Sequence, residues 1–325
     1  MAYDVLVTGG AGFIGGALLR ALAGAGRRVI SADLREAAHD HVHLDLARPW
    51  TFDELLAAHR PRAVVHCAAL VDDRGRLEDF ERINVEGSRE LALACARAGV
   101  ERFVQLSSIA ALGYDPGPDA DEATPMDLDN PTPYFQTKAR SEQAVRDVAA
   151  RTRLPTVVIR PGDVYGPGSV PWVERPLALL HQRLPTLLEG GRGTMAHCHV
   201  DNLVSAIALA LEVPAAVGEV FIVHDGPHTS MRDYVTRLAG AAGAPAPRSM
   251  GKGVALALAR AGQVASRAGV TPPMTPGAVA YLTRRATYRT DQARDVLGWA
   301  PHVGLDEGMM RLGASLRGAS GGARR

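Results

Sequence analysis

The sequence predicts an α/β fold in which a doubly wound parallel sheet carries a smaller C-terminal lobe. Two observations predict it. In the first half of the 325 residues, short β-branched runs alternate with stretches whose apolar residues recur at three- and four-residue spacing. This is the pattern of strands that alternate with amphipathic helices. The runs are also largely apolar, as strands covered on both faces of a parallel sheet must be.

The first half is expected to hold five strands and four helices. The strands are predicted at Val5–Thr8, Arg28–Ala32, Ala63–His66, Phe103–Ser107 and Thr156–Arg160. The helices are predicted at Phe13–Ala25, Phe52–Ala58, Ile83–Ala98 and Thr137–Ala150. After Arg160, proline and glycine become frequent, so the regular alternation is expected to end there.

The second half contains fewer clear elements. A helix is expected with Asp201 or Asn202 as its cap, and Val220–Val223 has the composition of a further core strand. The segment Ser230–Asp233 has the spacing of a capping box that opens another helix. The apolar segment Val254–Ala268 is interpreted as a packed helix or as a lid over an apolar pocket.

Composition argues against several classes of protein. The formal net charge is +1 and no run of like charges stands out, which argues against a nucleic-acid surface. The three cysteines form no Cys-x-x-Cys pair, so neither a disulfide scaffold nor a zinc ribbon is indicated. No apolar stretch reaches the ~18–20 residues that spanning a bilayer requires. We therefore expect a cytoplasmic protein with no stable membrane insertion.

His39, His41 and His43 alternate without a fourth ligand, so we expect a solvated loop and no metal site.

Gly9, Gly12 and Gly15 lie between the first predicted strand and the first predicted helix. Glycines at this spacing let the backbone turn tightly and let a pyrophosphate approach the N-terminus of the helix. Asp33 follows the second strand, close to the spacing of ~20 residues at which an acid accepts hydrogen bonds from the ribose 2′-hydroxyl. A carboxylate there repels a 2′-phosphate, so NAD(H) is favoured over NADP(H), although Arg35 stands close by.

This site predicts how the chain divides. Residues 1–162 are expected to form a Rossmann-type NAD-binding domain, with later returns near residues 196–226. Residues 163–316 are expected to form mainly a substrate-binding lobe, and residues 317–325, which are glycine-rich and basic, a disordered tail.

Tyr134 and Lys138 stand four residues apart, so on a helix they share a face. A tyrosine has a pKa of ~10 and needs its anion stabilised to act as an acid or base near neutrality. A fixed ammonium group at this spacing provides that. Ser107 and Ser108 end the preceding strand at the edge of the sheet where ligands bind in such folds. A serine hydroxyl there can hydrogen-bond a substrate oxygen beside Tyr134.

Together these features resemble the extended short-chain dehydrogenase/reductase family over nearly the whole chain. The motifs that carry the resemblance are Thr8–Gly15, Asp33, Asp45-Leu46, His66–Ala69, Asn84, Ser107-Ser108, Tyr134 with Lys138, and Arg160–Gly162. The resemblance implies that NAD is held by Gly9, Gly12, Phe13, Ile14, Gly15, Asp33, Asp45, Leu46, Ala68, Ala69, Tyr134, Lys138, Pro161, Gly162 and Val164.

The resemblance also implies individual roles. Asp45 and Leu46 would hold the adenine, Ala68 and Ala69 would line the cofactor, and Lys138 would also bind the nicotinamide ribose. Pro161, Gly162 and Val164 would lie along the nicotinamide.

Ser108, rather than Ser107, matches the catalytic serine, because Gly113 follows it at the family's usual distance. Asn84 would be a structural support. Many relatives are dimers, so a homodimer is expected.

The branch of the family is the harder question. Nucleotide-sugar epimerases usually carry an Asn in the stretch where this chain has Arg160–Pro167, and an arginine where it has Met195 and Ala196. Sugar dehydratases place an acidic pair where it has Ile109-Ala110. In contrast, the segments His199–Ala206 and Pro272–Thr275 resemble the 3β-hydroxysteroid dehydrogenase/isomerase-like branch.

That branch implies a bulky apolar substrate of a sterol-, polyketide- or lipid-like kind, which suits a lobe rich in Val, Leu and Ala. Tyr134 would exchange the proton of a secondary alcohol, Ser108 would position its oxygen, and Lys138 would lower the pKa of Tyr134. Arg175, Arg183 and Arg192 could still serve a diphosphate. Two alternatives therefore stay open, a nucleotide-sugar 4-epimerase with transiently reduced NAD and a non-catalytic NAD-binding sensor.

Overall fold

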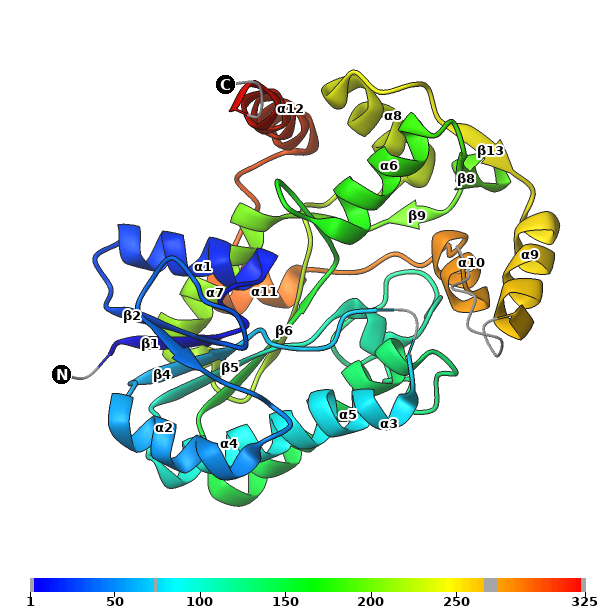
Figure 1. The fold of residues 1–325 in the computed structure, drawn as a ribbon. Coiled ribbons are helices and arrows are strands. Elements are labelled where there is room, and N and C mark those ends of the chain that lie inside the picture. Colours follow the sequence, from blue (N-terminus) through cyan, green and yellow to red (C-terminus); the bar gives the residue numbers. More distant parts are fainter. Residues whose placement is uncertain (1–2, 73–74, 266–273, 323–325) are drawn as a thin grey trace.

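The fold is built around one parallel sheet of seven strands, in the order β11-β6-β5-β4-β1-β2-β3 (Figure 1). The computed structural model describes residues 3–72, 75–265 and 274–322. The sheet strands are β1 (Val5–Thr8), β2 (Val29–Asp33), β3 (His41–His43), β4 (Ala63–His66), β5 (Arg102–Leu106), β6 (Thr156–Pro161) and β11 (Val220–Val223). The chain has the predicted α/β fold, with a doubly wound sheet.

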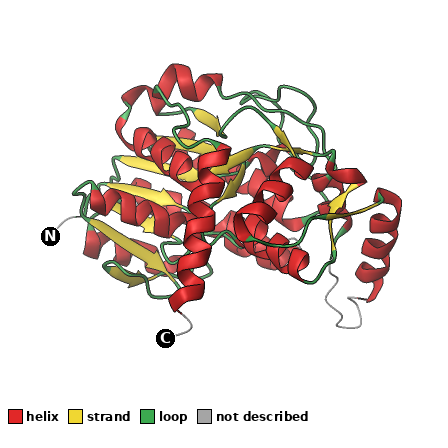
Figure 2. Ribbon diagram, turned by 90° about the horizontal axis from the view of Figure 1, so that it is seen from above, coloured by secondary structure: helices red, strands yellow, loops and turns green. Residues whose placement is uncertain are grey.

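Helices cover both faces of this sheet. The helices are α1 (Phe13–Gly24), α2 (Phe52–His59), α3 (Leu77–Phe80), α4 (Gly87–Arg97), α5 (Pro133–Thr152), α6 (Arg175–His181), α7 (Val200–Glu212), α8 (Met231–Ala242), α9 (Lys252–Ala265), α10 (Pro276–Leu282), α11 (Asp291–Leu297) and α12 (Leu305–Gly322). One face carries α1, α7 and α11 and the other carries α2, α4 and α5 (Figure 1). Seen from above, the helices surround the strands (Figure 2).

The two-residue period of the strands explains the two covered faces. Leu6 and Val64 point into the core beneath α2, α4 and α5, whereas Val7 and Val65 point into the core beneath α1 and α7. All four side chains are fully buried, so neither face of these central strands meets water.

Short strands and the later helices form a second lobe beside the carboxyl edge of the sheet (Figure 1). Its strands pair in twos: β7 (Asp163–Tyr165) with β10 (His197–His199), β9 (Thr194–Met195) with β12 (Thr229–Ser230), and β8 (Pro185–Leu188) with β13 (Arg248–Met250). The helices α6, α8 and α12 pack together around a separate apolar core that includes Leu177, Leu238 and Leu312. The boundary near residue 162 stays a prediction.

Several expectations need correction. Residues 41–43 form the edge strand β3 rather than a loop. The cap of α7 is His199, whose Nδ1 accepts a hydrogen bond from the backbone N–H of Asp201 at 3.2 Å, so neither Asp201 nor Asn202 is the cap. The predicted disordered tail is wrong for residues 317–322, which continue α12, and residues 323–325 lie outside the described residues.

Other expectations hold. Ser230 caps α8 by accepting a hydrogen bond from the backbone N–H of Asp233 at 3.0 Å. The apolar segment predicted at 254–268 forms α9 as far as Ala265, and its last three residues lie outside the described residues. None of the helices in the described part of the chain is both long and apolar enough to cross a membrane.

Candidate active site

The glycine loop between β1 and α1 leaves space that side chains would fill. Gly9 has φ +71°, and a Cβ on Gly15 would lie 2.2 Å from the Gly9 carbonyl oxygen, so the loop and the helix can approach this closely only without side chains. Gly12 precedes α1 and no side chain caps that helix, which leaves its first N–H groups facing outward. Phe13 and Ile14 are the first two residues of α1. This uncapped terminus has the chemistry of an anion site.

Asp33 ends β2 beside the glycine loop. Its carboxylate accepts hydrogen bonds from the backbone N–H groups of Ala11 at 3.1 Å and Arg35 at 3.0 Å. The Arg35 guanidinium donates to the carbonyl oxygen of Ala11 at 3.2 Å, so it lies over the loop rather than against the Asp33 carboxylate. The carboxylate keeps unused lone pairs that can accept hydroxyl groups.

The next segments meet the same edge of the sheet. Ala68 lies against the glycine loop, because a Cβ on Gly9 would come within 2.8 Å of the Ala68 nitrogen. The Ala68 N–H donates to the Thr8 hydroxyl at 3.2 Å, and Ala69 follows it. Asp45 and Leu46 lie just beyond β3, next to Asp33, whose carbonyl oxygen accepts the N–H of Leu44.

Leu46 is buried against Gly87, and the Asp45 carboxylate accepts the N–H of Ala47 at 2.9 Å. On the other side of the edge, Pro161 ends β6 and Val164 lies in β7. A Cβ on Gly162 would come within 2.1 Å of the Ala196 carbonyl oxygen. This glycine therefore lets β6 and β7 pass close to β10.

Ser108 lies beside Tyr134 at the carboxyl edge of β5, close enough to influence the pKa of the phenol. Burial raises the pKa of Tyr134 to about 12, the Ser108 hydroxyl lowers it, and the negative charge of Asp163 raises it. Ser107 instead donates to the Glu142 carboxylate at 2.7 Å. The two adjacent serines therefore face different partners, and Ser108 is the one beside Tyr134.

Lys138 lies one helical turn after Tyr134. Helix α5 begins at Pro133 rather than at the predicted Thr137, because a proline is well suited to the first turn of a helix. The buried Lys138 ammonium donates to the Leu106 carbonyl oxygen at 2.8 Å, and burial lowers its pKa to about 8. Lys138 was expected to lower the pKa of Tyr134, but the causes of the Tyr134 shift are burial, Ser108 and Asp163, and Lys138 is not one of them.

Asn84 lies in a π-helical turn, Glu81–Glu86, that precedes α4. Its amide group accepts from the Leu70 N–H at 2.7 Å and donates to the Leu70 carbonyl oxygen and the Thr137 hydroxyl, each at 3.2 Å. These contacts tie the segment after β4 to α5, the helix that bears Tyr134. Asn84 is thus a structural support.

An aromatic wall adjoins Tyr134. The Phe135 ring packs edge-on against Tyr114 at 4.8 Å and Tyr281 at 5.1 Å between ring centroids, and it contacts Tyr134 at 5.9 Å. A cavity of about 430 Å³ opens beside Tyr114 and extends to Ala280 of α10. The sequence did not single out this wall, since its members lie in three segments joined only by the fold.

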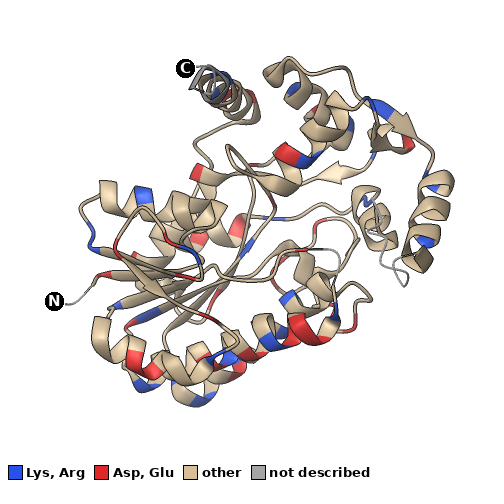
Figure 3. Cartoon of the chain, in the orientation of Figure 1, with Lys and Arg blue, Asp and Glu red and all other residues tan. Residues whose placement is uncertain are grey.

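The wall and the cavity are mostly uncharged on the side of α10. This helix contains no charged residue, as Figure 3 shows. Charged side chains reach the cavity from elsewhere, namely Asp115, Asp127 and Lys252. The cavity therefore meets the aromatic wall at Tyr114, and its lining carries charges of both signs.

A buried ion pair lies behind the wall. Arg284 contacts the Asp163 carboxylate, and Tyr281 donates its hydroxyl to the same carboxylate at 2.9 Å. Burial raises the pKa of Asp163, and the charge of Arg284 opposes that rise. Asp163, the first residue of β7, lies in the stretch Arg160–Pro167 that the sequence analysis considered, but the sequence gave no signal for Tyr281 or Arg284.

A second buried pair supports α5. The Glu142 carboxylate, four residues after Lys138, accepts from the Arg160 guanidinium at 2.7 and 2.9 Å. With the bond from Ser107, it joins α5 to β5 and β6. The four-residue spacing from Lys138 was a signal for Glu142 that the sequence analysis did not use.

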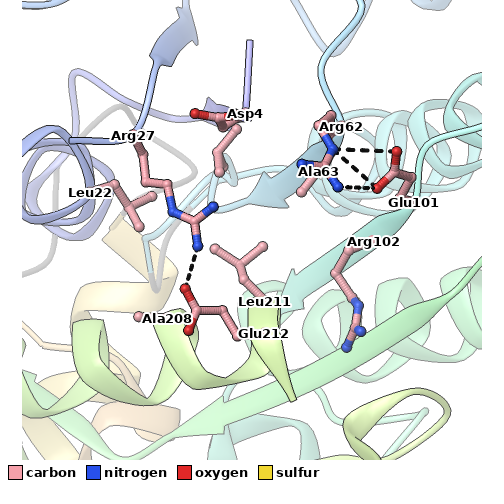
Figure 4. A pocket seen from close by; sticks show the side chains of 11 residues that line it. Asp4, Leu22, Arg27, Arg62, Ala63, Glu101, Arg102, Ala208, Leu211 and Glu212 are labelled. Atoms are coloured by element: carbon pink, nitrogen blue, oxygen red, sulfur yellow. Dashed lines mark hydrogen bonds and ion pairs between the residues drawn. The ribbon is translucent and has the colours of Figure 1, made fainter. Parts of the chain in front are cut away.

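Another cavity, of about 160 Å³, lies at the amino ends of β1, β4 and β5, opposite the candidate site. Figure 4 shows that Arg27 turns to Glu212 and that Arg62 turns to Glu101 at its walls. Two of its arginines are thus paired with carboxylates, and the cavity is far from Tyr134 along the strands.

Comparisons with known proteins identify a family model and several similar chains. A family model described as "NAD dependent epimerase/dehydratase family" matches residues 5–223. The chain is 31% identical to 2-alkyl-3-oxoalkanoate reductase of Stenotrophomonas maltophilia, over 96% of this chain and 98% of the relative. It is 30% identical to UDP-glucose 4-epimerase of Mycolicibacterium smegmatis, over 94% of this chain and 96% of the relative.

Among solved structures, the chain resembles MoeE5 in complex with UDP-glucose and NAD. The TM-score is 0.78 and the identity 27%, and the match covers 98% of this chain and 99% of that chain. The similar proteins therefore include both reductases and epimerases.

Proposed function

Because the chain belongs to the NAD-dependent epimerase/dehydratase family, we propose that it is an NAD(H)-dependent oxidoreductase that interconverts a secondary alcohol and a ketone. Its substrate is bulky and apolar, of a sterol-, polyketide- or lipid-like kind. The observation that carries this proposal is the Tyr134–Ser108 pair beside an aromatic wall and a cavity of about 430 Å³.

NAD is the cofactor, and the structure offers a fitting place for it. The uncapped N-terminus of α1, with Gly9, Gly12 and Gly15 cleared of side chains, suits the pyrophosphate. The Asp33 carboxylate suits the ribose hydroxyls and disfavours a 2′-phosphate.

We propose that the remaining contacts to the cofactor come from residues near the carboxyl edge of the sheet. The segments involved are Phe13-Ile14, Asp45-Leu46, Ala68-Ala69, Pro161-Gly162 with Val164, and the side chains of Tyr134 and Lys138. These segments follow β1, β3, β4 and β6 of the large sheet or lie in β7 and α5.

The proton chemistry belongs to Tyr134. NAD⁺, when bound, supplies the hydride acceptor. In oxidation, Tyr134 takes the proton of the substrate hydroxyl, and in reduction it returns a proton to the carbonyl oxygen. Ser108, which lies beside Tyr134, positions that oxygen. Lys138 supplies a positive charge beneath the pair, held in place by the Leu106 carbonyl.

A nucleotide-sugar 4-epimerase is the second candidate, because a relative of that name is 30% identical over nearly the whole chain. A non-catalytic NAD-binding sensor is the third, and retention of Tyr134, Ser108 and Lys138 together argues against it. The homodimer and the cytoplasmic location stay predictions.

Net formation of NADH separates these candidates. NAD⁺ would be mixed with the protein and with hydroxysteroids and other apolar secondary alcohols, and in parallel with UDP- and dTDP-sugars. We expect NADH absorbance to rise with an apolar alcohol and not with the sugars. Conversion of a sugar to its epimer without net NADH would favour the epimerase, and no reaction with either set would favour the sensor.

A further inference from the structure

The ion pair between Asp163 and Arg284 lies completely inside the protein. The exposed fractions of the two side chains are 1% and 0%. The Asp163 carboxylate also accepts the Tyr281 hydroxyl at 2.9 Å and the Ala196 N–H at 3.0 Å. The Arg284 guanidinium donates to the Tyr281 carbonyl oxygen at 3.0 Å. Such a pair is stable in place only while both charges are present.

This pair is directly behind the aromatic wall, whose Tyr114 lines the cavity. The Arg284 guanidinium stacks on the Tyr281 ring at 3.7 Å from its centroid, and that ring packs on Phe135 beside Tyr134. Thr283, the residue before Arg284, lines the cavity of about 430 Å³. One layer of side chains thus separates a guanidinium from the place where the substrate is proposed to bind.

A guanidinium in this position is a strong phosphate ligand when nothing else neutralises it, since its planar fork matches two phosphate oxygens. Here Asp163 cancels the charge. The lining of the cavity sets one cation, Lys252, against two carboxylates, Asp115 and Asp127, so with Arg284 neutralised a nucleoside diphosphate would lose its hydration without a net gain of positive charge. An uncharged substrate suffers no such loss.

We propose that Asp163 is a specificity-determining residue, which neutralises Arg284 and thereby restricts the substrate cavity to uncharged substrates. The inference rests on the proposed function for the place where substrate binds. It predicts that loss of the carboxylate creates a site for phosphate-bearing ligands such as a nucleoside diphosphate.

The test is the binding of UDP to the Asp163→Asn variant, measured by titration calorimetry with saturating NAD⁺. Saturation fills the dinucleotide site, so UDP can bind only elsewhere. We expect the variant to bind UDP at least about tenfold more tightly than the wild type, with an affinity that falls as salt is added. Equal affinity of the two proteins would overturn the inference, as would tight binding of UDP by the wild type.

Two further variants control for the charge. Asp163→Asn combined with Arg284→Gln removes both charges, and its affinity for UDP should return to that of the wild type. Tyr281→Phe removes a hydrogen bond from Asp163 but leaves the charges balanced, so it should not gain affinity. A gain in either variant would mean that loosened packing, rather than the freed cation, admits UDP.

The Asp163→Asn variant carries an unpaired buried cation and is expected to be less stable than the wild type. Inorganic pyrophosphate should then raise its Tm by more than it raises that of the wild type. If the variant does not fold, even with pyrophosphate, no anion can replace the carboxylate and the inference is wrong. None of these measurements depends on catalytic turnover. Their failure would therefore be distinguishable from a failure of the proposed function in the alcohol assay.

Discussion

Lys138 is buried and Tyr134 is partly buried, and burial acts on the pKa values of the two side chains in opposite directions. It raises the pKa of the phenol to about 12 and lowers the pKa of the ammonium group to about 8. In each case the uncharged form is favoured because the charged form loses its hydration. Near neutrality Lys138 therefore still carries its charge, and Tyr134 holds its proton firmly until substrate and cofactor change its surroundings.

Removal of the Tyr134 hydroxyl tests its role. We expect Tyr134→Phe to lower kcat by about 10²-fold or more, because the substrate oxygen loses its proton partner. The affinity for NADH, measured by fluorescence titration, should stay close to that of the wild type. Tyr3→Phe removes a hydroxyl at the opposite edge of the sheet and should have no effect. Near-normal turnover of Tyr134→Phe would contradict the assignment.

Asp33 can be tested through the cofactor alone. We expect Asp33→Ala to weaken NADH binding by about tenfold or more, since hydrogen bonds to a charged acceptor are among the stronger ones. Glu36→Ala removes an exposed carboxylate three residues later and serves as the matched control. If both variants keep the dissociation constant of the wild type, Asp33 does not hold the ribose.

The helix α5 carries three polar groups at four-residue spacing, Tyr134, Lys138 and Glu142, and all three face the sheet. They have different partners there: Ser108, the Leu106 carbonyl and Arg160. Glu142 is the only one of the three that joins α5 to β6 by a charge pair. The position of Tyr134 therefore depends on a contact two turns farther along the same helix.

Glu142→Gln is expected to lower the free energy of unfolding by about 3 kcal/mol, because the buried Arg160 cation loses its counter-charge. Urea unfolding at constant pH measures the change. Glu101→Gln breaks the exposed pair with Arg62 and should leave the unfolding midpoint almost unaltered. A similar small effect for both variants would show that the Arg160 pair contributes little.

The strands of the large sheet that form apolar runs were predictable, whereas the short strands and several helices of the second lobe were not. The bounds of β1, β4 and β11 were predicted correctly, since each is an apolar run that ends at a polar residue or a turn. Strands of two or three residues, such as β9, have no measurable period. The start of α5 was placed late, at Thr137, whereas the helix begins at Pro133.

At the scale of the whole molecule, the buried histidines make stability depend on pH. His66 joins Thr8 to Ser88, and Ser88 gives its own proton to the Asn84 carbonyl. His66 therefore donates through Nε2, and in the neutral ring that burial favours, its Nδ1 accepts from the Thr8 hydroxyl. Burial lowers the pKa of His66 to about 3 and that of His197 to about 4.

These shifts predict acid sensitivity. Above a pH of about 6.5 both the folded and the unfolded chains hold neutral histidines, and stability is full. As the pH falls below 6.5, only the unfolded chain takes up protons, so each such group removes about 1.4 kcal/mol per pH unit until its folded pKa is reached. Urea unfolding between pH 7.5 and about 4.5 measures the slope.

The variant His66→Gln should make that slope shallower, whereas His43→Gln, at an exposed position, should leave it as in the wild type. If the slope of His66→Gln matches that of the wild type, the pKa of His66 is the same in the folded and the unfolded chain, and the histidine does not cause the acid sensitivity. The comparison is valid only where unfolding is two-state.

The candidate site was predictable in part for the same physical reasons as the fold. Residues at the carboxyl ends of the sheet strands were found because a strand pattern fixes where its end lies. The contact between Asp163 and Arg284 joins positions 121 residues apart and depends on how the second lobe folds back. No local pattern in the sequence records such a contact.

The order of the sheet has a consequence for the synthesis of the chain. Strand β11 completes the sheet by pairing with β6, yet 58 residues, from 162 to 219, separate the two strands. At about 5–20 residues per second, the ribosome adds those residues over roughly 3–12 seconds. Throughout that time β6 is an apolar edge without its neighbour, the kind of surface that nascent chains must keep from each other and that chaperones bind.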